Sequence, residues 1–157
     1  MNQNQMYTAT PAILRSSFMA LMIMLVNCSA LAKTNTMKPE EINARFAQAF
    51  NSGKMENILA LYEKNAVVHS SATQADQGHQ KIAAGLKPLL ALGGQMQATN
   101  VFVSQSGGIA LLRADWKLTG AKKEDGSPLE LGGTSIEVVR QQPNGTWLYV
   151  IDQPFGK

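Results

Sequence analysis

One stretch, residues 45–71, constrains the fold of this chain more than any other. It reads RFAQAFNSGKMENILALYEKNAVVHSS, with amphipathic helical patterns on either side of Gly53 and a β-branched run after them. So short a connection between two helices requires a tight corner, and Gly53 is the expected left-handed residue that ends the first helix. The stretch therefore predicts two short helices that lead directly into the first strand of a sheet.

Helical patterns occupy the rest of the N-terminal half as well. Pro39, followed by two glutamates, suits the first turn of a helix, and apolar residues recur at helical spacing over residues 42–50. The apolar stripe of the second helix is expected to end at Tyr62. Residues 81–92 carry a third stripe, which a Gly-Gly pair ends, so we expect three helices.

Strand patterns dominate after residue 94. A first short strand is expected over residues 66–70, and the polar residues 71–78 indicate a loop. Because the helical patterns come first and the consecutive strands follow, the sequence predicts an α+β fold. We expect a cone-shaped, strongly curved antiparallel sheet, with three N-terminal helices closing over a pocket. The pair Gly132-Gly133 is expected to form a β-bulge. The four later strands, joined by tight turns, are expected at residues 95–104, 109–119, 129–141 and 146–152.

Residues 1–32 have the order of parts found in a secretory signal peptide. Arg15 supplies a positive charge, residues 18–26 are an unbroken apolar run, and Ala-Leu-Ala at residues 30–32 suits a cleavage site. The apolar run is shorter than the ~20 residues that a membrane-spanning helix needs. We therefore expect an exported bacterial protein, periplasmic or secreted, whose mature part is a single domain at residues 33–157.

Cys28 is the only cysteine, so no disulfide can form within the chain. An alternative to simple cleavage is lipidation of Cys28, although Asn27 fits poorly before a lipidated cysteine. Cleavage after Ala32 would leave a mature chain without cysteine, which excludes thiol catalysis and cysteine-bound zinc.

The charge pattern gives no sign of a nucleic-acid or membrane partner for the mature domain. The net charge is +3, and the one adjacent basic pair, Lys122-Lys123, is followed at once by two acidic residues. No phosphate loop, dinucleotide fingerprint, nucleophile elbow or zinc helix motif occurs, so no cofactor is expected. His69, Asp76 and His79 could gather as metal ligands, but their spacing matches no metal motif strongly, and surface positions on a loop are favoured.

Several short segments together resemble a known superfamily, and the likeness extends over nearly all of residues 33–157. The chain is similar to the ketosteroid-isomerase-like branch of the nuclear-transport-factor-two-like superfamily, and most of all to SnoaL-like proteins. That fold hosts isomerases, cyclases, hydrolases, dehydratases and binding modules, so the resemblance implies a fold more than an activity. It rests on Arg45-Phe46, Asn51-Ser52-Gly53, residues 58–62, residues 65–68, Gly78 with Ile82, and Asn144-Gly145-Thr146-Trp147 leading to Asp152.

The resemblance also implies where an isomerase would keep its catalytic groups. The oxyanion-binding Tyr of that family falls at Phe46, and a phenyl ring cannot donate the hydrogen bond. The general-base Asp falls at or next to Ser70, whose hydroxyl cannot take a proton from carbon without a partner base. The protonated Asp falls near Glu137. Two of the three groups are missing, so steroid isomerase activity is not expected.

Glu137 is the best candidate for acid–base chemistry, because it stands in an otherwise apolar strand. In the pocket, burial would raise its pKa and suit it to proton transfer. The alternative is an outward-facing carboxylate paired with a Lys or Arg. The residues expected to line the pocket are Phe46, Tyr62, Ser70 and Trp116, and for Trp116 a plain core position is an equal alternative.

Other conspicuous residues have structural explanations. His69 is expected on the strand face opposite Ser70, and Asp152 is expected to serve the turn that follows the last strand. Arg113 and Asp115 alternate with apolar residues and indicate the outer face of the sheet, which often forms a dimer interface in related folds. Trp147 and Tyr149 are expected to be core or interface aromatics.

These patterns together predict an exported, homodimeric SnoaL-like domain that binds a small, mostly apolar molecule. Any reaction would use acid–base catalysis without a cofactor, as in an isomerase, a cyclase or a hydrolase. The alternative is a non-enzymatic module that uses the same fold to bind a ligand or a partner protein.

Overall fold

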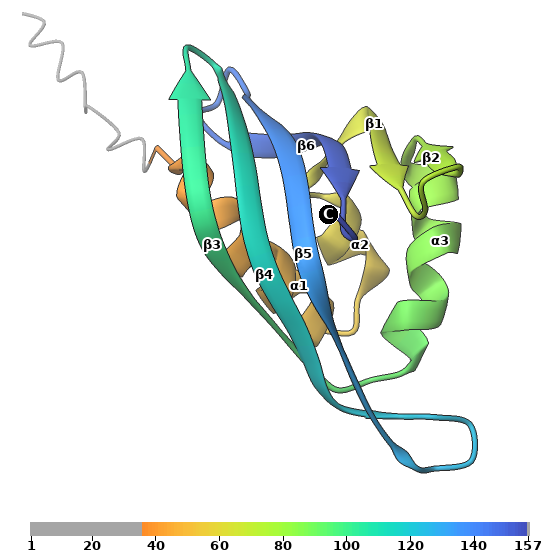
Figure 1. Ribbon diagram of the computed structural model, residues 1–157. Helices are drawn as coiled ribbons and strands as arrows, with labels where there is room; N and C mark the ends of the chain where they lie inside the picture. Colours follow the sequence, from red (N-terminus) through yellow and green to blue (C-terminus); the bar gives the residue numbers. More distant parts are fainter. Residues whose placement is uncertain (1–35, 157) are drawn as a thin grey trace, which may run out of the picture. The chain divides into compact units, whose positions relative to one another are not determined.

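The helices come early in the chain and the strands follow, as the computed structural model of residues 36–156 shows (Figure 1). The helical elements are the 3-10 turn η1 (Pro39–Glu41), α1 (Ile42–Asn51), α2 (Met55–Leu59) and α3 (His79–Ala91). The strands are β1 (Tyr62–His69), β2 (Ala75–Gln77), β3 (Gln95–Ser106), β4 (Ile109–Lys122), β5 (Pro128–Gln141) and β6 (Trp147–Gln153).

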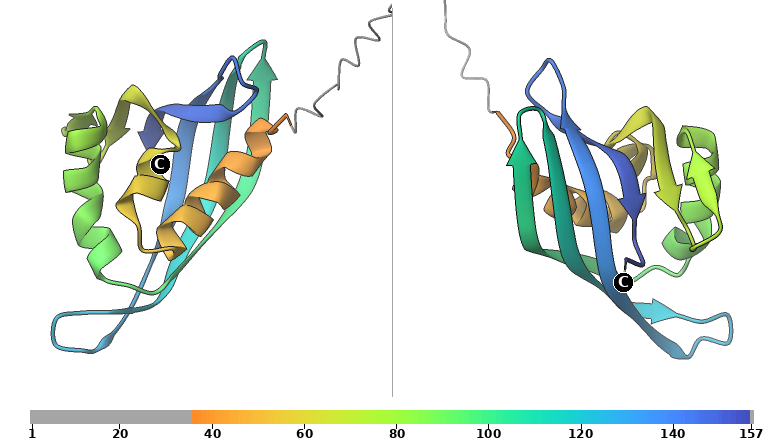
Figure 2. Two further views of the ribbon diagram at one scale, coloured as in Figure 1. Left: turned by 180° about the vertical axis from the view of Figure 1, so that it is seen from behind. Right: turned by 45° about the horizontal axis from the view of Figure 1, so that its top comes forward.

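The six strands of this region form one curved sheet in the order β2-β1-β6-β5-β4-β3. Helix α1 packs against β3, and α3 packs against β1 and β2, so the helices lie along one side of the sheet (Figure 2). This arrangement confirms the expected α+β fold with helices closing over a curved sheet. The sheet is mostly antiparallel, because β1 runs parallel to β6 while all other neighbours are antiparallel.

Two boundaries in the region of residues 55–78 differ from the sequence prediction. Tyr62 begins β1, where it pairs with Tyr149 of β6, and the preceding helix α2 already ends at Leu59. The polar residues expected to be a loop contain a further strand, β2, which pairs with the end of β1. Periodicity failed here because elements of three to five residues contain fewer than two repeats of their pattern, too few for the period to be recognised.

The predicted bulge at Gly132-Gly133 was wrong. Both glycines keep regular register with β4, and the shift in that strand pair lies between Leu118 and Ala121. Gly133 instead makes room for the indole of Trp116, whose Nε1 would lie 3.3 Å from a Cβ added to this glycine. Gly133 therefore leaves room for a neighbouring side chain, and it does not bend the strand.

The core lies between the sheet and the helices, and β4 shows how the sequence directs side chains to it. Residues of this strand alternate between buried and exposed from Ile109 to Leu118. The exposed set includes Arg113 and Asp115, so the expected outer face is confirmed. The inward set consists of Ala110, Leu112, Ala114, Trp116 and Leu118.

The turn between α3 and β3 depends on Gly94. Substitution of Gly94 by Ala should therefore lower the free energy of unfolding more than the same substitution at Gly53. Gly94 has φ +88°, and an added Cβ would lie 2.6 Å from the Thr119 carbonyl oxygen; Gly53 has φ +69° with nothing within 4 Å. Gly53→Ala should cost about 1 kcal/mol of unfolding free energy through left-handed strain alone. Gly94→Ala should cost roughly 2 kcal/mol more, because a backbone clash is added to the strain. Urea unfolding of both variants tests this, and equal losses would contradict it.

No helix within residues 36–156 is long and apolar enough to cross a membrane. The expected leader at residues 1–32, with Cys28, lies outside the described residues.

Candidate functional site

A cavity of about 400 Å³ opens between the sheet and helices α1 and α3. Its walls are mostly apolar: α3 supplies Ile82, Leu86 and Leu89, and β3 supplies Met96 and Ala98. The polar side chains of the cavity come mainly from α1, β5 and β6. A small molecule would therefore find hydrocarbon on one side and hydrogen-bonding groups on the other.

Glu137 projects into this cavity from β5 and is 3% exposed. Its strand position pairs with Leu112, an inward residue of β4, so the pleat turns the carboxyl to the core side. Asn43 donates a hydrogen bond to Oε2 at 3.4 Å. Burial raises the pKa of Glu137 to about 7 and the carboxyl of Asp152 adds to the rise, while hydrogen bonds from Ser135 and Asn43 oppose it.

Asp152 lies directly opposite Glu137 on the neighbouring strand β6 and is 7% exposed. The Tyr62 hydroxyl donates a hydrogen bond to Oδ2 at 2.5 Å. Burial raises the pKa of Asp152 to about 6, and the hydrogen bond from Tyr62 limits the rise. Residues paired in this way have Cβ atoms about 4.5–5.5 Å apart, so the cavity holds two adjacent buried carboxyls.

Asn43 of α1 connects Glu137 to the rest of a polar network. The Tyr149 hydroxyl donates to Asn43 Oδ1 at 2.5 Å, which leaves the Asn43 amide group to donate to Glu137 and to Asn100 Oδ1 at 2.9 Å. Asn100 in turn donates to the Glu40 carbonyl at 2.7 Å. The network fixes the orientation of both the amide and the Glu137 carboxyl.

Two tyrosines remain hydrogen-bond donors in this site at all ordinary pH values. Burial, followed by the carboxyl of Asp152, raises the pKa of Tyr62 well above its usual value. The same causes, in the same order, raise the pKa of Tyr149. Phe46 packs edge-on against both rings, with centroids 6.4 and 6.1 Å away, and completes an aromatic wall beside the carboxyls.

The cavity brings together three of the four residues expected to line it. Phe46, Ser70 and Trp116 are in its wall, and the buried Ser70 Oγ has no hydrogen-bond partner among the described residues. The Trp116 indole donates to the Pro154 carbonyl at 2.7 Å, which holds the C-terminal segment at the cavity. The fourth residue, Tyr62, was expected in the wall but is not part of it. Its hydroxyl instead donates a hydrogen bond to Asp152, which does line the cavity.

The three residues considered as metal ligands do not share one position. Asp76 of β2 lines the cavity next to Gly85, whereas the His79 ring nitrogen Nε2 lies 3.0 Å from the Tyr62 carbonyl oxygen. His69 ends β1, opposite Ala75. Within residues 36–156, no three His, Cys, Asp or Glu side chains are grouped to hold a metal ion.

Sequence reasoning missed Asp152 and Asn43 as site residues. Along β6, Trp147, Tyr149 and Asp152 are all buried, a spacing that strict alternation forbids. The register of β5 with β6 shifts between Val138 and Val139, and this irregularity turns Asp152 inward. The one available signal was the Asp at the end of an apolar strand, which is also typical of turn chemistry.

The fold and this cavity define a ligand-binding or catalytic domain of the nuclear-transport-factor-two-like superfamily. A family model described as a SnoaL-like domain matches residues 43–147, and the chain belongs to that family. The resemblance seen in the sequence is thereby confirmed. No curated protein matches the sequence.

Three solved structures illustrate the likeness, and at these identities they show the fold alone. A ketosteroid isomerase-like protein from Erwinia carotovora has a TM-score of 0.64 at 19% identity, covering 73% of this chain and 89% of that one. A putative dehydratase from Streptomyces avermitilis has a TM-score of 0.55 at 17% identity, covering 71% and 88%. A putative calcium/calmodulin-dependent protein kinase II association domain from Xanthomonas campestris has a TM-score of 0.60 at 11% identity, covering 74% and 85%.

Proposed function

We propose that residues 33–157 form an exported SnoaL-like enzyme that binds a small, mostly apolar molecule and moves a proton within it without a cofactor. One observation carries the proposal: Glu137 and Asp152, both buried, lie opposite each other on adjacent strands in a mostly apolar cavity. Two carboxyls placed in this way can act on one ligand together.

The two carboxyls have different environments, which suits them to different roles. Asp152 accepts a hydrogen bond from the Tyr62 hydroxyl at 2.5 Å, which stabilises the ionised carboxyl, and it is the proposed base. Glu137 accepts a longer hydrogen bond, at 3.4 Å from Asn43, so its charge is less stabilised, and it is the proposed acid. This pair supports isomerisation or elimination. The position of the steroid isomerases' oxyanion donor is occupied by Phe46, so a steroid isomerase is not proposed.

Proton transfer can be tested before the natural substrate is known. The purified domain, in deuterated buffer, is incubated with its co-purifying small molecule, identified by mass spectrometry, and with a panel of small cyclic ketones. Exchange of carbon-bound hydrogen is followed by NMR. We expect faster exchange than in buffer for at least one compound. The matched control is Asp115→Asn, which removes a carboxylate from the exposed face of β4 and should exchange like wild type.

The rival function is a non-enzymatic binding module on the same cavity. The residues that carry the isomerases' chemistry are replaced here by Phe46 and Ser70, which favours this rival. A tightly held co-purifying molecule, together with exchange no faster than in buffer for every compound, would establish the rival and exclude the enzyme.

A homodimer is also proposed, and its interface is the part of the outer sheet face that carries Phe102, Ile109, Leu111 and Ile151. This face carries exposed apolar side chains around Arg113, a composition typical of protein–protein contacts. They are Phe102, Ile109, Leu111 and Ile151, each between 40% and 43% exposed.

Leu111→Glu should convert the dimer to a monomer, because a charge would be buried at the centre of an apolar contact. Light scattering at micromolar concentration measures the mass of both proteins. Lys117→Glu, further along the same strand face, is the control and should stay dimeric. A monomeric wild type would contradict the proposal.

A further inference from the structure

Three carboxyls line the cavity, and none of them has a cationic partner within residues 36–156. Asp76 of β2, Glu137 of β5 and Asp152 of β6 all belong to its wall, whereas no described Lys, Arg or His does. The two salt bridges within residues 36–156, Arg45–Glu41 and Arg140–Glu63, involve none of these acids. The carboxyl of Asp76, which is partly exposed, has neither a hydrogen bond nor an ion pair within the same residues.

This arrangement is unfavourable for the protein alone. A buried carboxylate without a charged partner costs several kcal/mol, and the hydrogen-bond donors to the buried Glu137 and Asp152 are the neutral side chains of Asn43 and Tyr62. Charges of one sign in a cavity with low-dielectric walls attract a ligand of the opposite sign and repel one of the same sign. We therefore expect the ligand to carry the positive charge that compensates these carboxylates.

The rest of the cavity suits the remaining parts of such a ligand. The rings of Phe46, Tyr149 and Trp116 are in the wall, and aromatic faces attract ammonium groups at close range. Helix α3 offers Ile82, Leu86 and Leu89 to hydrocarbon. The unpartnered Ser70 hydroxyl provides one more hydrogen-bonding position.

We propose that the natural ligand is an apolar molecule with a basic amine, whose ammonium group sits beside the adjacent carboxyls of Glu137 and Asp152, in a cavity that Asp76 also lines. The proposal rests on the proposed function, since it names the class of molecule for the same cavity. Carboxylates and phosphate esters are excluded from the site, because they would add a negative charge to three acids.

Three probes of one shape and different charge test this class: naphthylmethylamine, naphthylmethanol and naphthoate. Calorimetric titration of residues 33–157 at about pH 8, where both raised carboxyls are ionised, should show the amine binding at least about tenfold tighter than the alcohol. Naphthoate should not bind. At about pH 5 the preference for the amine should shrink, because Glu137 and Asp152 take up protons. The other titratable groups facing them are Asp76, Tyr62 and Tyr149.

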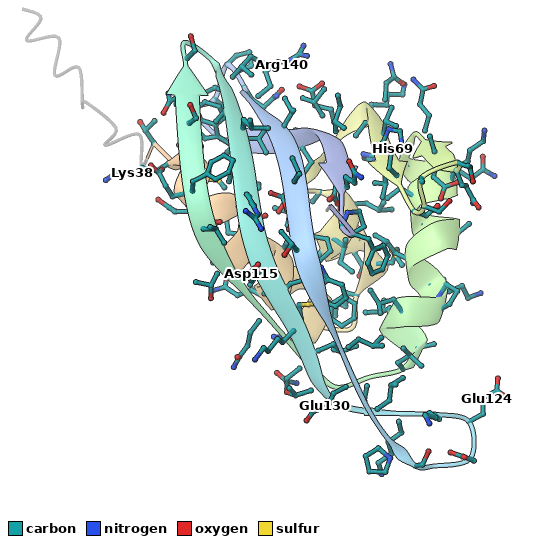
Figure 3. All side chains as sticks on the ribbon, in the orientation of Figure 1. Lys38, His69, Asp115, Glu124, Glu130 and Arg140 are labelled. Atoms are coloured by element: carbon teal, nitrogen blue, oxygen red, sulfur yellow. The ribbon has the colours of Figure 1, made fainter. Side chains whose placement is uncertain are left out.

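Variants show whether the carboxyls cause the preference. Asp152→Asn and Glu137→Gln should each reduce it at about pH 8, and Asp76→Asn serves as a third variant that removes no hydrogen bond within the described residues. Asp115→Asn, at a position labelled in Figure 3 on the outer face of β4, should bind like wild type.

Two results would overturn the amine proposal. If the alcohol binds as tightly as the amine, or if the preference survives in all three variants, the ligand class is wrong while the cavity's proposed function stands. If none of the probes binds at either pH, both the ligand class and the proposed small-molecule site fail.

Discussion

Replacement of Glu137 by Gln is expected to reduce proton transfer by the domain about 10²–10⁴-fold, the usual contribution of a positioned acid or base. Gln keeps the shape of the side chain and can still contact Asn43, which donates to Oε2 in the wild type. It cannot gain or lose a proton near neutral pH. Hydrogen exchange into the best ketone or into the co-purifying molecule, followed by NMR, measures the loss.

The control for this result must separate chemistry from folding. Glu137→Asp keeps an ionisable group on the same strand position and should retain part of the activity, whereas Asp115→Asn on the outer face should retain all of it. Circular dichroism confirms that each variant is folded. Full activity in the Gln variant would remove Glu137 from the mechanism.

The second large effect is a loss of stability with rising pH. Glu137 and Asp152 have their pKa values raised from 4.5 to about 7 and from 3.8 to about 6, so the folded protein binds their protons more tightly than the unfolded chain does. Stability is then greatest below about pH 4, falls as pH rises towards 7, and stays at its lower level above that. Each carboxyl can account for about 3 kcal/mol at most, from its pKa shift.

The double variant Glu137→Gln/Asp152→Asn should lose this part of the pH dependence. Its free energy of unfolding in urea should exceed that of wild type at about pH 8, because no charge is buried, and the excess should disappear at about pH 4. Asp115→Asn should follow the wild-type curve. A wild-type protein whose stability rises between these pH values, or a double variant with an unchanged curve, would contradict the assignment.

The sequence predicted most of the fold because its long elements carry clear periods. The alternation in β4 placed Trp116 inside and Arg113 outside, as found. The short elements carry too few residues for a period, so β2 was missed and Tyr62 was assigned to a helix. The parallel pairing of β1 with β6 joins residues about 85 positions apart, and no local pattern encodes such a contact.

The site was less accessible to sequence reasoning than the fold. Glu137 stood out because a lone carboxyl interrupts an apolar run, and its strand neighbours set its inward direction. Asp152 did not stand out, because an irregularity in the pairing of β5 with β6 reverses the direction that alternation gives it. Asn43 is one of several polar residues on α1, and only the packing of that helix selects it.

The parallel pairing of β1 with β6 also bears on how the chain folds. The first strand has β6 as one of its two neighbours, and β6 is the last of these six strands in the sequence. Closing so long a loop is slow, and the sheet stays open until residue 153 is available. A nascent chain therefore lacks Asp152 and the strand that carries it until the other five strands have been made. The same late step adds Trp147 and Tyr149 to the core and Asp152 to the cavity wall.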